Sequence, residues 1–587
     1  MSRRRIVLGH ANTWHDPAIA VSEGEFLFAE GLERHTQCKR ALDMPRLWYS
    51  WRPLRAWMSR MGQWPIDNAE IVSLSSWSGG ATTRLMERPA ANPVPALLAS
   101  SLLLEPLYNN QLRWTLQGYP PRVFSPPAAT RAGAVLPADV SWENKPVLHQ
   151  LAHAANAVYT SPFEECIVFV FDGYSEGTAL SVFRFADNRF ELLHQEKPQV
   201  SLGLLYALVT QFCGFNPYEG EEWKAMGLAA FGEPRDDLYD FFKARIVVEG
   251  LGVSFRAPPG ADRAFDVAAW SALEKLVGGF RAPGDDDIFK AADLAHNFQR
   301  CFVETIVELA DNASSLGLSK NLAYAGGCAL NSAANGRIVP GTGFDSLHVP
   351  SAPGDDGNAL GVVLFEKHFV RNEPRPAGIT SPYLGSVIDE EQLERILSFG
   401  GIDYREVGDD ASLCEAVADL LADGKIVAWV HGMAEFGPRA LGNRSILADP
   451  RSAGLKNLIN GRVKFRELYR PLAPAILDEK GADYFEDYQT SPYMERTLTF
   501  RTEVRDRVPG VVHQDGTGRP QSVREEWNPL FYRLIQAFYE KTDVPILMNT
   551  SLNVMGKPIV HSAQDAIAVF FTTGLDHLAI GRYILSK

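Results

Sequence analysis

The chain has 587 residues, of which 46% are apolar, and it carries a formal net charge of −14. This composition indicates a globular protein with at least two hydrophobic cores. It argues against general nucleic-acid binding, because phosphate backbones favour basic surfaces. The longest apolar run, residues 94–107, is too short and interrupted to span a bilayer and predicts a buried helix.

The cysteines and the first residues bear on the cellular compartment. The six cysteines are scattered without a CxxC pair, which is typical of reduced thiols rather than of a disulfide framework or a zinc ribbon. The opening MSRRRIVLGHANTWHD has only three consecutive apolar residues and is unlike a signal peptide. We therefore expect a cytoplasmic protein.

Strand and helix patterns alternate along the first part of the chain. Strands are predicted at 5–8 and 19–22, at 26–31 before a loop, and in ECIVFVFDGYSEG (165–177), where the strand ends at Asp172. Residues 286–318 have helical spacing. NLAYAGGCALN (321–331) predicts a strand, a glycine turn and a helix start, and 347–365 predicts a strand, a loop and a helix. The alternation predicts an α/β fold.

A second domain is predicted after a linker. Residues 367–385 are polar and then rich in proline and glycine, so we expect domains over 1–370 and 381–587. Beyond the linker, helices are predicted at 390–400 and 411–424, and strands at 425–432 and 543–553. Residues 46–145 carry no signal to which chemistry can be assigned.

Three small constellations precede the linker. His149 and His153 are four residues apart, which places both imidazoles on one helix face, and with Asp172 they suit a divalent transition metal. Surface or capping histidines are the alternative. The glycine pair of AGGCALN is suited to presenting backbone amides to phosphate or to forming a plain turn. The carboxylates in PGDDGNALG are suited to holding a metal or to capping a helix.

After the linker the local charge reverses. Between Arg439 and Arg470 the chain has eight basic and two acidic residues. Such a segment predicts an anionic partner, because guanidinium groups fit phosphate and carboxylate oxygens and glycines permit close approach. A solvated basic face is the alternative, but apolar neighbours such as Phe436, Leu441 and Ile446 disfavour it.

Ordered sequence blocks give a family resemblance outside residues 46–145. The most specific are EFGPRALGNRSILADPR (435–451), VKFRELYRPLAPAIL (463–477), DGTGRPQSV (515–523) and PILMNTSLNVMGKPIV (545–560). HDPAIAV (15–21), ERHTQCK (33–39), HQLAH, DGYSEG, EGEEWKAMGLAAFG (219–232), AGGCALN and GDDGNALG precede them in order. The chain resembles the O-carbamoyltransferases of the nodulation and antibiotic type, which act on aminoglycosides, cephalosporins and ansamycins.

The resemblance implies an α/β protein with an actin-like, two-lobed N-terminal domain followed by a YrdC-like domain. The second domain would make carbamoyl-adenylate from carbamoyl phosphate and ATP, with Mg²⁺ accompanying the ATP. The first would transfer the carbamoyl group to a hydroxyl of a small-molecule acceptor in secondary-metabolite biosynthesis, releasing AMP. No nucleic-acid or membrane partner is expected, and the family favours a homodimer.

The resemblance also assigns residues. The carbamoyl phosphate and ATP site would comprise Arg439, Arg444, Lys464, Arg466, Arg470, Arg519, Asn549 and Ser551, with Lys464 and Arg519 catalytic. The adenylate site of the first domain would comprise Lys224, Gly326, Gly327 and Asn331. The metal, usually Fe²⁺, would be held by His149, His153, Asp172 and Asp355. His15 would activate the acceptor, with a structural role beside Asp16 as the alternative. A surface role is the alternative for Arg462 and Arg466.

One motif departs from the family and three other functions stay open. The acids that usually precede the ER pair occur here as Glu30-Gly31-Leu32-Glu33, and we expect residues 46–145 to select the acceptor. A threonylcarbamoyl-adenylate enzyme of tRNA modification shares both domain types but would need a basic surface. A hydrogenase-maturation carbamoyltransferase would need an acylphosphatase-like segment and CxxC clusters. A non-carbamoylating actin-fold ATPase would have no use for a carbamoyl phosphate pocket.

Overall fold

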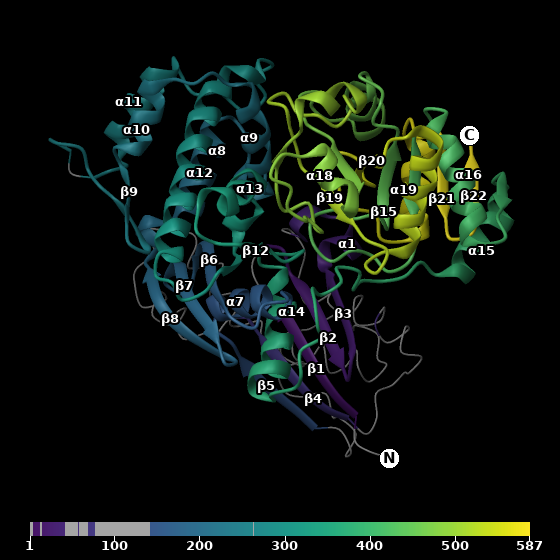
Figure 1. Cartoon of the computed structure of the whole chain (residues 1–587), viewed down its shortest axis with the longest axis horizontal. Coiled ribbons are helices and arrows are strands. Elements are labelled where there is room, and N and C mark those ends of the chain that lie inside the picture. The colour runs from purple at the N-terminus through teal and green to yellow at the C-terminus, as the bar shows by residue number, and fades with distance from the viewer. Residues whose placement is uncertain (1–3, 12–14, 42–56, 58–68, 77–140, 262) are drawn as a thin grey trace, which may run out of the picture.

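The computed structural model describes residues 4–11, 15–41, 57, 69–76, 141–261 and 263–587 (Figure 1). Within these ranges the chain forms two five-stranded sheets, one eight-stranded sheet and two two-stranded sheets, with helices packed on the larger ones. The α/β class expected from the sequence is confirmed. The helix expected over 94–107 lies outside the described residues.

The first lobe is built on a sheet of order β3-β2-β1-β4-β5. Its strands are β1 (Arg4–Ala11), β2 (Ala18–Glu23), β3 (Phe26–Gly31), β4 (Ala69–Ser75) and β5 (Ser141–Pro146). β1, β2 and β3 pair antiparallel, whereas β1, β4 and β5 pair parallel. Helix α14 (Gly357–Leu364) packs so closely on β1 that a Cβ at Gly9 would clash with the backbone oxygen of Ala359.

The second lobe repeats this topology. Its sheet has the order β12-β11-β6-β7-β8, with strands β6 (Cys166–Ser175), β7 (Thr178–Ala186), β8 (Arg189–Glu196), β11 (Asn321–Ala325) and β12 (Ser346–His348). β6, β7 and β8 are antiparallel, and β11 and β12 then add parallel to β6. The two lobes therefore share one strand order and one set of directions, as expected for an actin-like domain.

Helices fill the space between and around the lobes. Helix α7 (His149–Tyr159) lies between the two sheets, and one hydrophobic cluster joins α7 and α14 to strands of both lobes (Figure 1). The outer face of the second lobe is covered by α8 (Leu202–Phe212), α9 (Glu222–Leu228), α10 (Asp236–Lys243), α11 (Val267–Val277), α12 (Ala292–Ser314) and α13 (Ser332–Gly341). A short hairpin, β9 (Ile246–Glu249) and β10 (Gly252–Phe255), projects from this layer.

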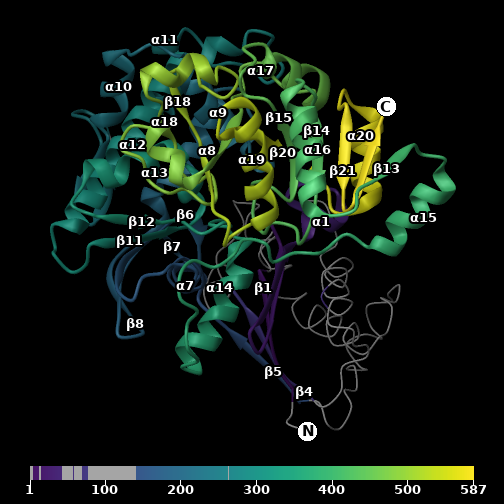
Figure 2. The same cartoon turned by 45° about the vertical axis from the view of Figure 1, so that its right-hand side comes forward.

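The C-terminal part is built on a mixed sheet of order β13-β22-β21-β14-β15-β20-β16-β19 (Figure 2). Its strands are β13 (Tyr404–Glu406), β14 (Val427–Val430), β15 (Arg444–Ala448), β16 (Ala473–Leu477), β19 (Gln521–Val523), β20 (Ile546–Ser551), β21 (His577–Ile580) and β22 (Tyr583–Ser586). Its helices are α15 (Glu390–Gly400), α16 (Asp410–Ala422), α17 (Leu455–Leu458), α18 (Gly481–Tyr484), α19 (Pro529–Thr542) and α20 (Ala563–Thr572). Strands β17 (Leu498–Thr499) and β18 (Thr517–Gly518) form a separate pair.

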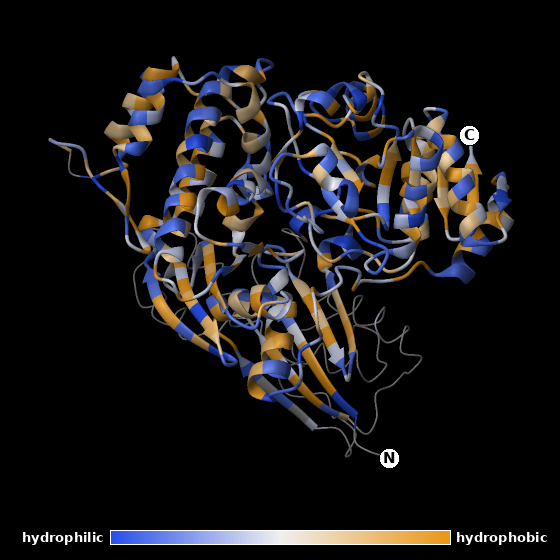
Figure 3. Cartoon of the chain, in the orientation of Figure 1, coloured by the Kyte–Doolittle hydropathy of each residue, from blue (hydrophilic) through white to orange (hydrophobic). Residues whose placement is uncertain are grey.

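Apolar residues follow the strands, whereas helices such as α12 and α19 alternate apolar and polar positions around their axes (Figure 3). This is the pattern of elements that are buried on one side. No helix of the described ranges combines the length and the apolar content that crossing a membrane requires.

Two local expectations differ from the structure. The segment after β3 was expected to be a loop, but it forms the short helix α1 (Leu32–Thr36). The strand expected to end at Asp172 continues to Ser175, with a register shift between Phe171 and Ser175 in its pairing with β7. Because a bulge leaves residues unpaired and redirects their side chains, Asp172 is released from the ladder and reaches α7.

Candidate active site

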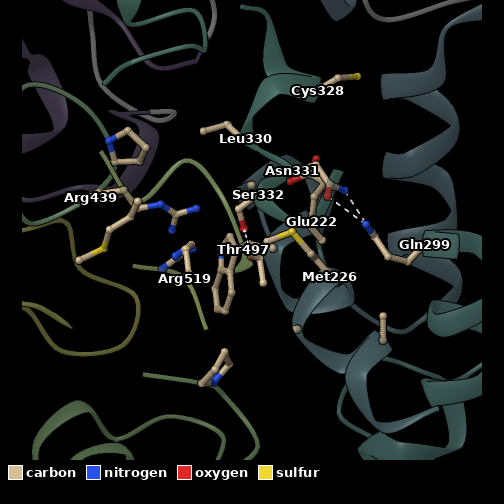
Figure 4. A pocket seen from close by; sticks show the side chains of 18 of the residues that line it. Glu222, Met226, Gln299, Cys328, Leu330, Asn331, Ser332, Arg439, Thr497 and Arg519 are labelled. Atoms are coloured by element: carbon tan, nitrogen blue, oxygen red, sulfur yellow. Dashed lines mark hydrogen bonds between the residues drawn. The ribbon is translucent and has the colours of Figure 1, made fainter. Parts of the chain in front are cut away.

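A cavity of about 1660 Å³ lies between the two lobes and the C-terminal sheet. Figure 4 shows Glu222, Gln299 and Asn331 on one side of it, with Arg439 and Arg519 on the other. His15 and Asp172 line the same cavity. Of the four predicted metal ligands only Asp172 lines the cavity, and ligand atoms of His149, His153 and Asp355 lie within 4.8 Å of its carboxylate but outside the lining. The structure therefore brings the edge of the histidine cluster and the arginine segment to one continuous space.

At one end, four predicted metal ligands lie together. Ligand atoms of His149, His153, Asp172 and Asp355 are all within 4.8 Å of one another. The two Nε2 atoms are 3.1 Å apart, and carboxylate oxygens of Asp355 and Asp172 lie 3.4 and 3.5 Å from His149 Nε2. Both imidazoles are buried on one face of α7, as the HQLAH spacing predicts.

The donor set fits a divalent transition metal. Ligands about 2.1 Å from one ion lie roughly 3.0–3.4 Å from each other, which is close to the distances found here. Burial alone would lower the pKa of His149, but Asp355 and Asp172 outweigh it and raise that pKa to about 10. The carboxylates thus favour positive charge at this point, which a proton or a metal cation would supply.

His15 lies beside this cluster. Its Nδ1 is 2.9 Å from Asp16 Oδ2 and 3.8 Å from Asp355 Oδ2. Asp16 also pairs with Arg40, and these cationic partners lower the pKa of Asp16 against the effect of burial. The side chain of His15 is partly exposed in the cavity, so both the predicted catalytic role and the structural pairing with Asp16 have a geometric basis.

At the other end, Arg439 and Arg519 line the cavity without an acidic counter-charge. Within the described part of the chain neither forms an ion pair, and Nε of Arg519 is buried without a hydrogen-bond partner. Burial and Arg470 lower the pKa of Arg439 to about 10. Burial and three neighbouring arginines hold the pKa of Arg519 well below its usual range. Uncompensated guanidinium groups in a cavity form a site for anions.

Arg466 and Arg470 extend the same wall. Arg470 stacks on Trp223, with 3.7 Å between its guanidinium carbon and the ring centroid, and has a long contact of 3.5 Å with Glu467. Arg466 lines the cavity and donates from Nε to Asn460 Oδ1 at 2.6 Å and from Nη2 to the backbone oxygen of Pro471 at 3.4 Å. The surface role considered for Arg466 does not fit this position, because burial holds its pKa well below the usual range.

Asn549 and Ser551 also line the cavity, but Lys464 lies behind them. Lys464 Nζ donates to the backbone oxygen of Ser551 at 2.6 Å, to its Oγ at 3.1 Å, and to Asn553. Lys464 is not part of the cavity lining in this structure, so its predicted catalytic role would require its ammonium to leave these partners.

Arg444 departs most from its predicted role. It is fully buried and lies outside the cavity lining. Its guanidinium donates to backbone oxygens of His431 at 2.8 Å, Asn443 at 2.9 Å and Ser386 at 3.1 Å. With its donors used on carbonyl groups, Arg444 holds the start of β15 to the linker instead of presenting charge to a ligand.

Comparisons with known proteins identify the family to which the chain belongs. The carbamoyltransferase N-terminus family model matches residues 132–364, and the carbamoyltransferase C-terminus model matches residues 418–587. Nodulation protein NolO of Bradyrhizobium diazoefficiens is 34% identical over 450 residues, covering 75% of this chain and 78% of NolO. The chain belongs to the carbamoyltransferase family. The resemblance stated from the sequence blocks is confirmed, and the protein is a carbamoyltransferase enzyme.

Other similar proteins extend the coverage. Nodulation protein U of Rhizobium tropici is 27% identical over 613 residues, covering 98% of this carbamoyltransferase and 95% of its own chain. Among solved structures, full-length HypF in a phosphate- and nucleotide-bound form is 13% identical with a TM-score of 0.32, covering 62% of this chain and 56% of HypF.

The predicted adenylate loop of this carbamoyltransferase lies next to the metal-type cluster. Gly327 donates its backbone N–H to Asp172 Oδ1 at 3.1 Å. Gly326 has a φ of 93°, and a Cβ there would clash with the backbone of Phe171. Asn331 lines the cavity and exchanges hydrogen bonds with Gln299. Lys224 lies outside the lining, because its ammonium pairs with Glu221 at 2.6 Å and Glu467 at 3.0 Å.

Two cavity residues, Trp223 and Arg34, were missed by sequence reasoning, and a third, Asp356, was considered only as a metal-holding or helix-capping carboxylate. Trp223 carries the stack with Arg470, and Arg34 donates to the backbone oxygen of Gly437 at 2.9 Å. Asp356 lines the cavity, and burial with Asp16 and Glu33 raises its pKa to about 8. Arg34 and Trp223 lie in the blocks ERHTQCK and EGEEWKAMGLAAFG, which were recognised as family blocks but not assigned a role.

The two ends of the cavity meet at Gly437. This glycine has a φ of 120°, and a Cβ there would clash with the backbone oxygen of Ser351. Gly437 lies two residues before Arg439, and Ser351 lies four residues before Asp355. The loop that carries the arginine therefore packs directly on the loop that carries the metal-type ligand.

Proposed function

We propose that this carbamoyltransferase makes carbamoyl-adenylate at the arginine end of the cavity and discharges it onto an acceptor hydroxyl at the histidine end. The supporting observation is the single cavity, whose lining includes Arg439 and Arg519 as well as His15 and Asp172. An intermediate formed at one end would reach the other without passing through bulk water.

The first step needs many cations. The carbamoyl group is a poor electrophile, and joining it to AMP supplies a good leaving group. Water cleaves carbamoyl phosphate to carbamate and phosphate. A carbamate oxygen then attacks the α-phosphorus of ATP, and pyrophosphate leaves. Arg439, Arg466, Arg470 and Arg519 would hold these phosphates, with Mg²⁺ accompanying the ATP.

The second step needs a base and a polarised carbonyl. The acceptor hydroxyl attacks the carbamoyl carbon, the bond to AMP breaks, and the hydroxyl proton passes to the imidazole of His15, which Asp16 orients through Nδ1. Asp172 and Asp355 with the two α7 histidines would hold a divalent metal, for which we propose Fe²⁺, and a bound metal supplies Lewis-acid polarisation of the carbonyl.

We assign residues 1–370 to the transfer domain and 381–587 to the adenylate-forming domain. In support, the buried members of the largest hydrophobic cluster all lie between Leu393 and Leu585. We further propose a small-molecule acceptor, because the cavity is enclosed by both domains and the chain is acidic overall.

Pyrophosphate release tests the adenylation step. The purified chain is incubated with Mg²⁺ and ATP, with and without carbamoyl phosphate, and pyrophosphate is measured with a coupled enzyme assay. We expect release only when carbamoyl phosphate is present. Equal release without it would remove carbamoyl-adenylate from the proposal while leaving the family assignment intact.

A further inference from the structure

A second group of metal-type donors lies outside the cavity, where the two domains meet. Glu30 ends β3, His35 lies on α1, and His561 lies two residues before α20. Glu30 Oε2 is 2.7 Å from His35 Nε2, and Glu30 Oε1 is 3.4 Å from His561 Nδ1. Their ligand atoms all lie within 4.8 Å of one another, and the two imidazole centroids are 4.0 Å apart.

We propose that Glu30, His35 and His561 form a second divalent-metal site, of the zinc-binding type, that joins the two domains. Two imidazole nitrogens and one carboxylate are a donor set that Zn²⁺ accepts, with a fourth position left for water. None of the three side chains lines the active-site cavity. The site therefore lies apart from the active-site cavity and shares no residue with the cluster on α7.

Hydrogen bonds from a neighbouring residue fix the orientation of the carboxylate in this group. Ser386 donates its backbone N–H to Glu30 Oε1 at 3.1 Å and its hydroxyl to Glu30 Oε2 at 2.6 Å, which fixes the carboxylate plane. Such hydrogen bonds orient ligand carboxylates in metal sites. Nδ1 of His561 has only its long 3.4 Å contact with Glu30 and makes no well-aligned hydrogen bond in the described chain, and the side chain is 20% exposed, which gives an ion a route of entry.

The group lies where helix α1 contacts the C-terminal domain, so a bound metal would strengthen this contact. Helix α1 is tied to the C-terminal domain on both sides of His35: Arg34 donates to the backbone oxygen of Gly437 at 2.9 Å, and Gln37 to that of Ile559 at 3.3 Å. A metal at Glu30, His35 and His561 would cross-link the same helix to the segment before α20. It would thereby hold the loop of Arg439 against the first lobe.

Protons are the competing occupant. With protonated imidazoles, the three side chains would form a buried ion pair, and the positive partners do hold the pKa of Glu30 well below its usual range against the effect of burial. The two occupants differ in stoichiometry, because a metal site adds one bound ion for each chain and an ion pair adds none.

The experiment counts bound zinc after separating the two sites. The full chain is stripped with a chelator and dialysed against Zn²⁺, and bound zinc is measured by mass spectrometry for wild type, His153→Ala, and His153→Ala with His561→Ala. Glu30→Gln in the His153→Ala background gives a second variant with little change of volume. His577→Ala, which replaces a histidine on β21 outside both clusters, is the matched control.

We expect His153→Ala to retain one equivalent of zinc, which either His561→Ala or Glu30→Gln then removes, while His577→Ala binds as much as wild type. Circular dichroism tests whether each variant is folded. If the variant with His561→Ala does not fold, zinc binding by the variant with Glu30→Gln tests the site. Loss of all zinc in His153→Ala alone would overturn the site. Retention of one equivalent of zinc in the folded double variants would also overturn the site, and Glu30, His35 and His561 would then form an ion pair.

Discussion

The two ends of the cavity solve opposite electrostatic problems. At the α7 end, two imidazoles face two carboxylates, so each charge has a partner within about 4 Å. At the other end, Arg439 and Arg519 form no ion pair in the described chain, and the charged neighbours that lower their pKa values are all arginines. Keeping like charges together in a cavity costs stability, and that cost is recovered when an anion binds. The comparison shows that the charges at the α7 end are compensated within the protein, whereas those at the arginine end are compensated only when an anion binds.

The largest effect is expected from removing an unpaired guanidinium. Arg519→Ala should slow pyrophosphate formation by about 10²–10³-fold, the usual loss for one preorganised charge-stabilising donor. Transfer from supplied carbamoyl-adenylate should stay close to wild type, because the charged neighbours of Arg519 are arginines of the other end, whereas His15 contacts Asp16 and Asp355. Arg533→Ala, an exposed arginine on α19, is the control. A folded Arg519→Ala that loses both partial reactions would contradict this division.

The converse variant addresses the other end. His149→Ala should lose the metal of the α7 cluster and raise the barrier of carbamoyl transfer by several kcal/mol, about the contribution of a Lewis acid. Pyrophosphate formation from ATP and carbamoyl phosphate should persist. Metal analysis and the two separate assays check this. An unchanged metal content, measured with the Glu30→Gln variant as background, would refute the ligand assignment.

Two arginines five residues apart should differ in stability. Arg444→Ala removes buried hydrogen bonds to three backbone oxygens, of which that of His431 has no other donor in the described chain, and should lower the free energy of unfolding by about 3 kcal/mol. Arg439→Ala removes a charge that has no partner and should leave that free energy unchanged or raise it. Urea unfolding of both variants measures the difference. Equal losses would mean that Arg439 also has a structural role.

The smallest effect, counted for one histidine and one pH unit, concerns acid. His348 ends β12 before the loop of Asp355, and His431 follows β14 before the loop of Arg439. Burial lowers the pKa of each to about 3. The unfolded chain therefore takes up these protons near pH 6.5 and the folded chain only near 3, so stability falls as pH drops through this window, by about 1.4 kcal/mol per pH unit for each histidine.

Urea unfolding between pH 7 and pH 4 checks that slope. His348→Gln and His431→Gln should each make the free energy of unfolding less dependent on pH, because each substitution removes one of the two buried histidines. A slope that neither substitution changes would assign the acid sensitivity to other groups.

The sequence predicted much of the fold because its signals are local. The i,i+4 spacing of His149 and His153 was enough to place both on one face of a helix, and apolar runs located β6, β11, β14 and β20. The repeat of the lobes was predicted only through the family resemblance and not from local patterns, because strand order depends on pairing between distant segments. The bulge that frees Asp172 depends on its register with β7, which the pattern of one strand does not encode.

The site was less predictable for the same reason. Arg439 and Arg444 lie in one motif, and the sequence predicts the same role for both. In the structure Arg439 lines the cavity, whereas Arg444 donates hydrogen bonds to backbone oxygens. The difference comes from the turn between them and from Ser386, which is 58 residues away from Arg444. Arg34 and Glu30 were missed because their partners are more than 350 residues distant in sequence.

The glycine at the meeting of the two loops has a consequence for taking the enzyme apart. Since Gly437 rests on the backbone of Ser351, the loop of Arg439 packs directly on the loop of Asp355, and these are the two places where we propose that the mixed anhydride is formed and consumed. If the polypeptide were cut in the linker and the two fragments were mixed, they would form the carbamoylated product only to the extent that they bind each other again. Every gap between them would divert the anhydride to hydrolysis and spend ATP without product.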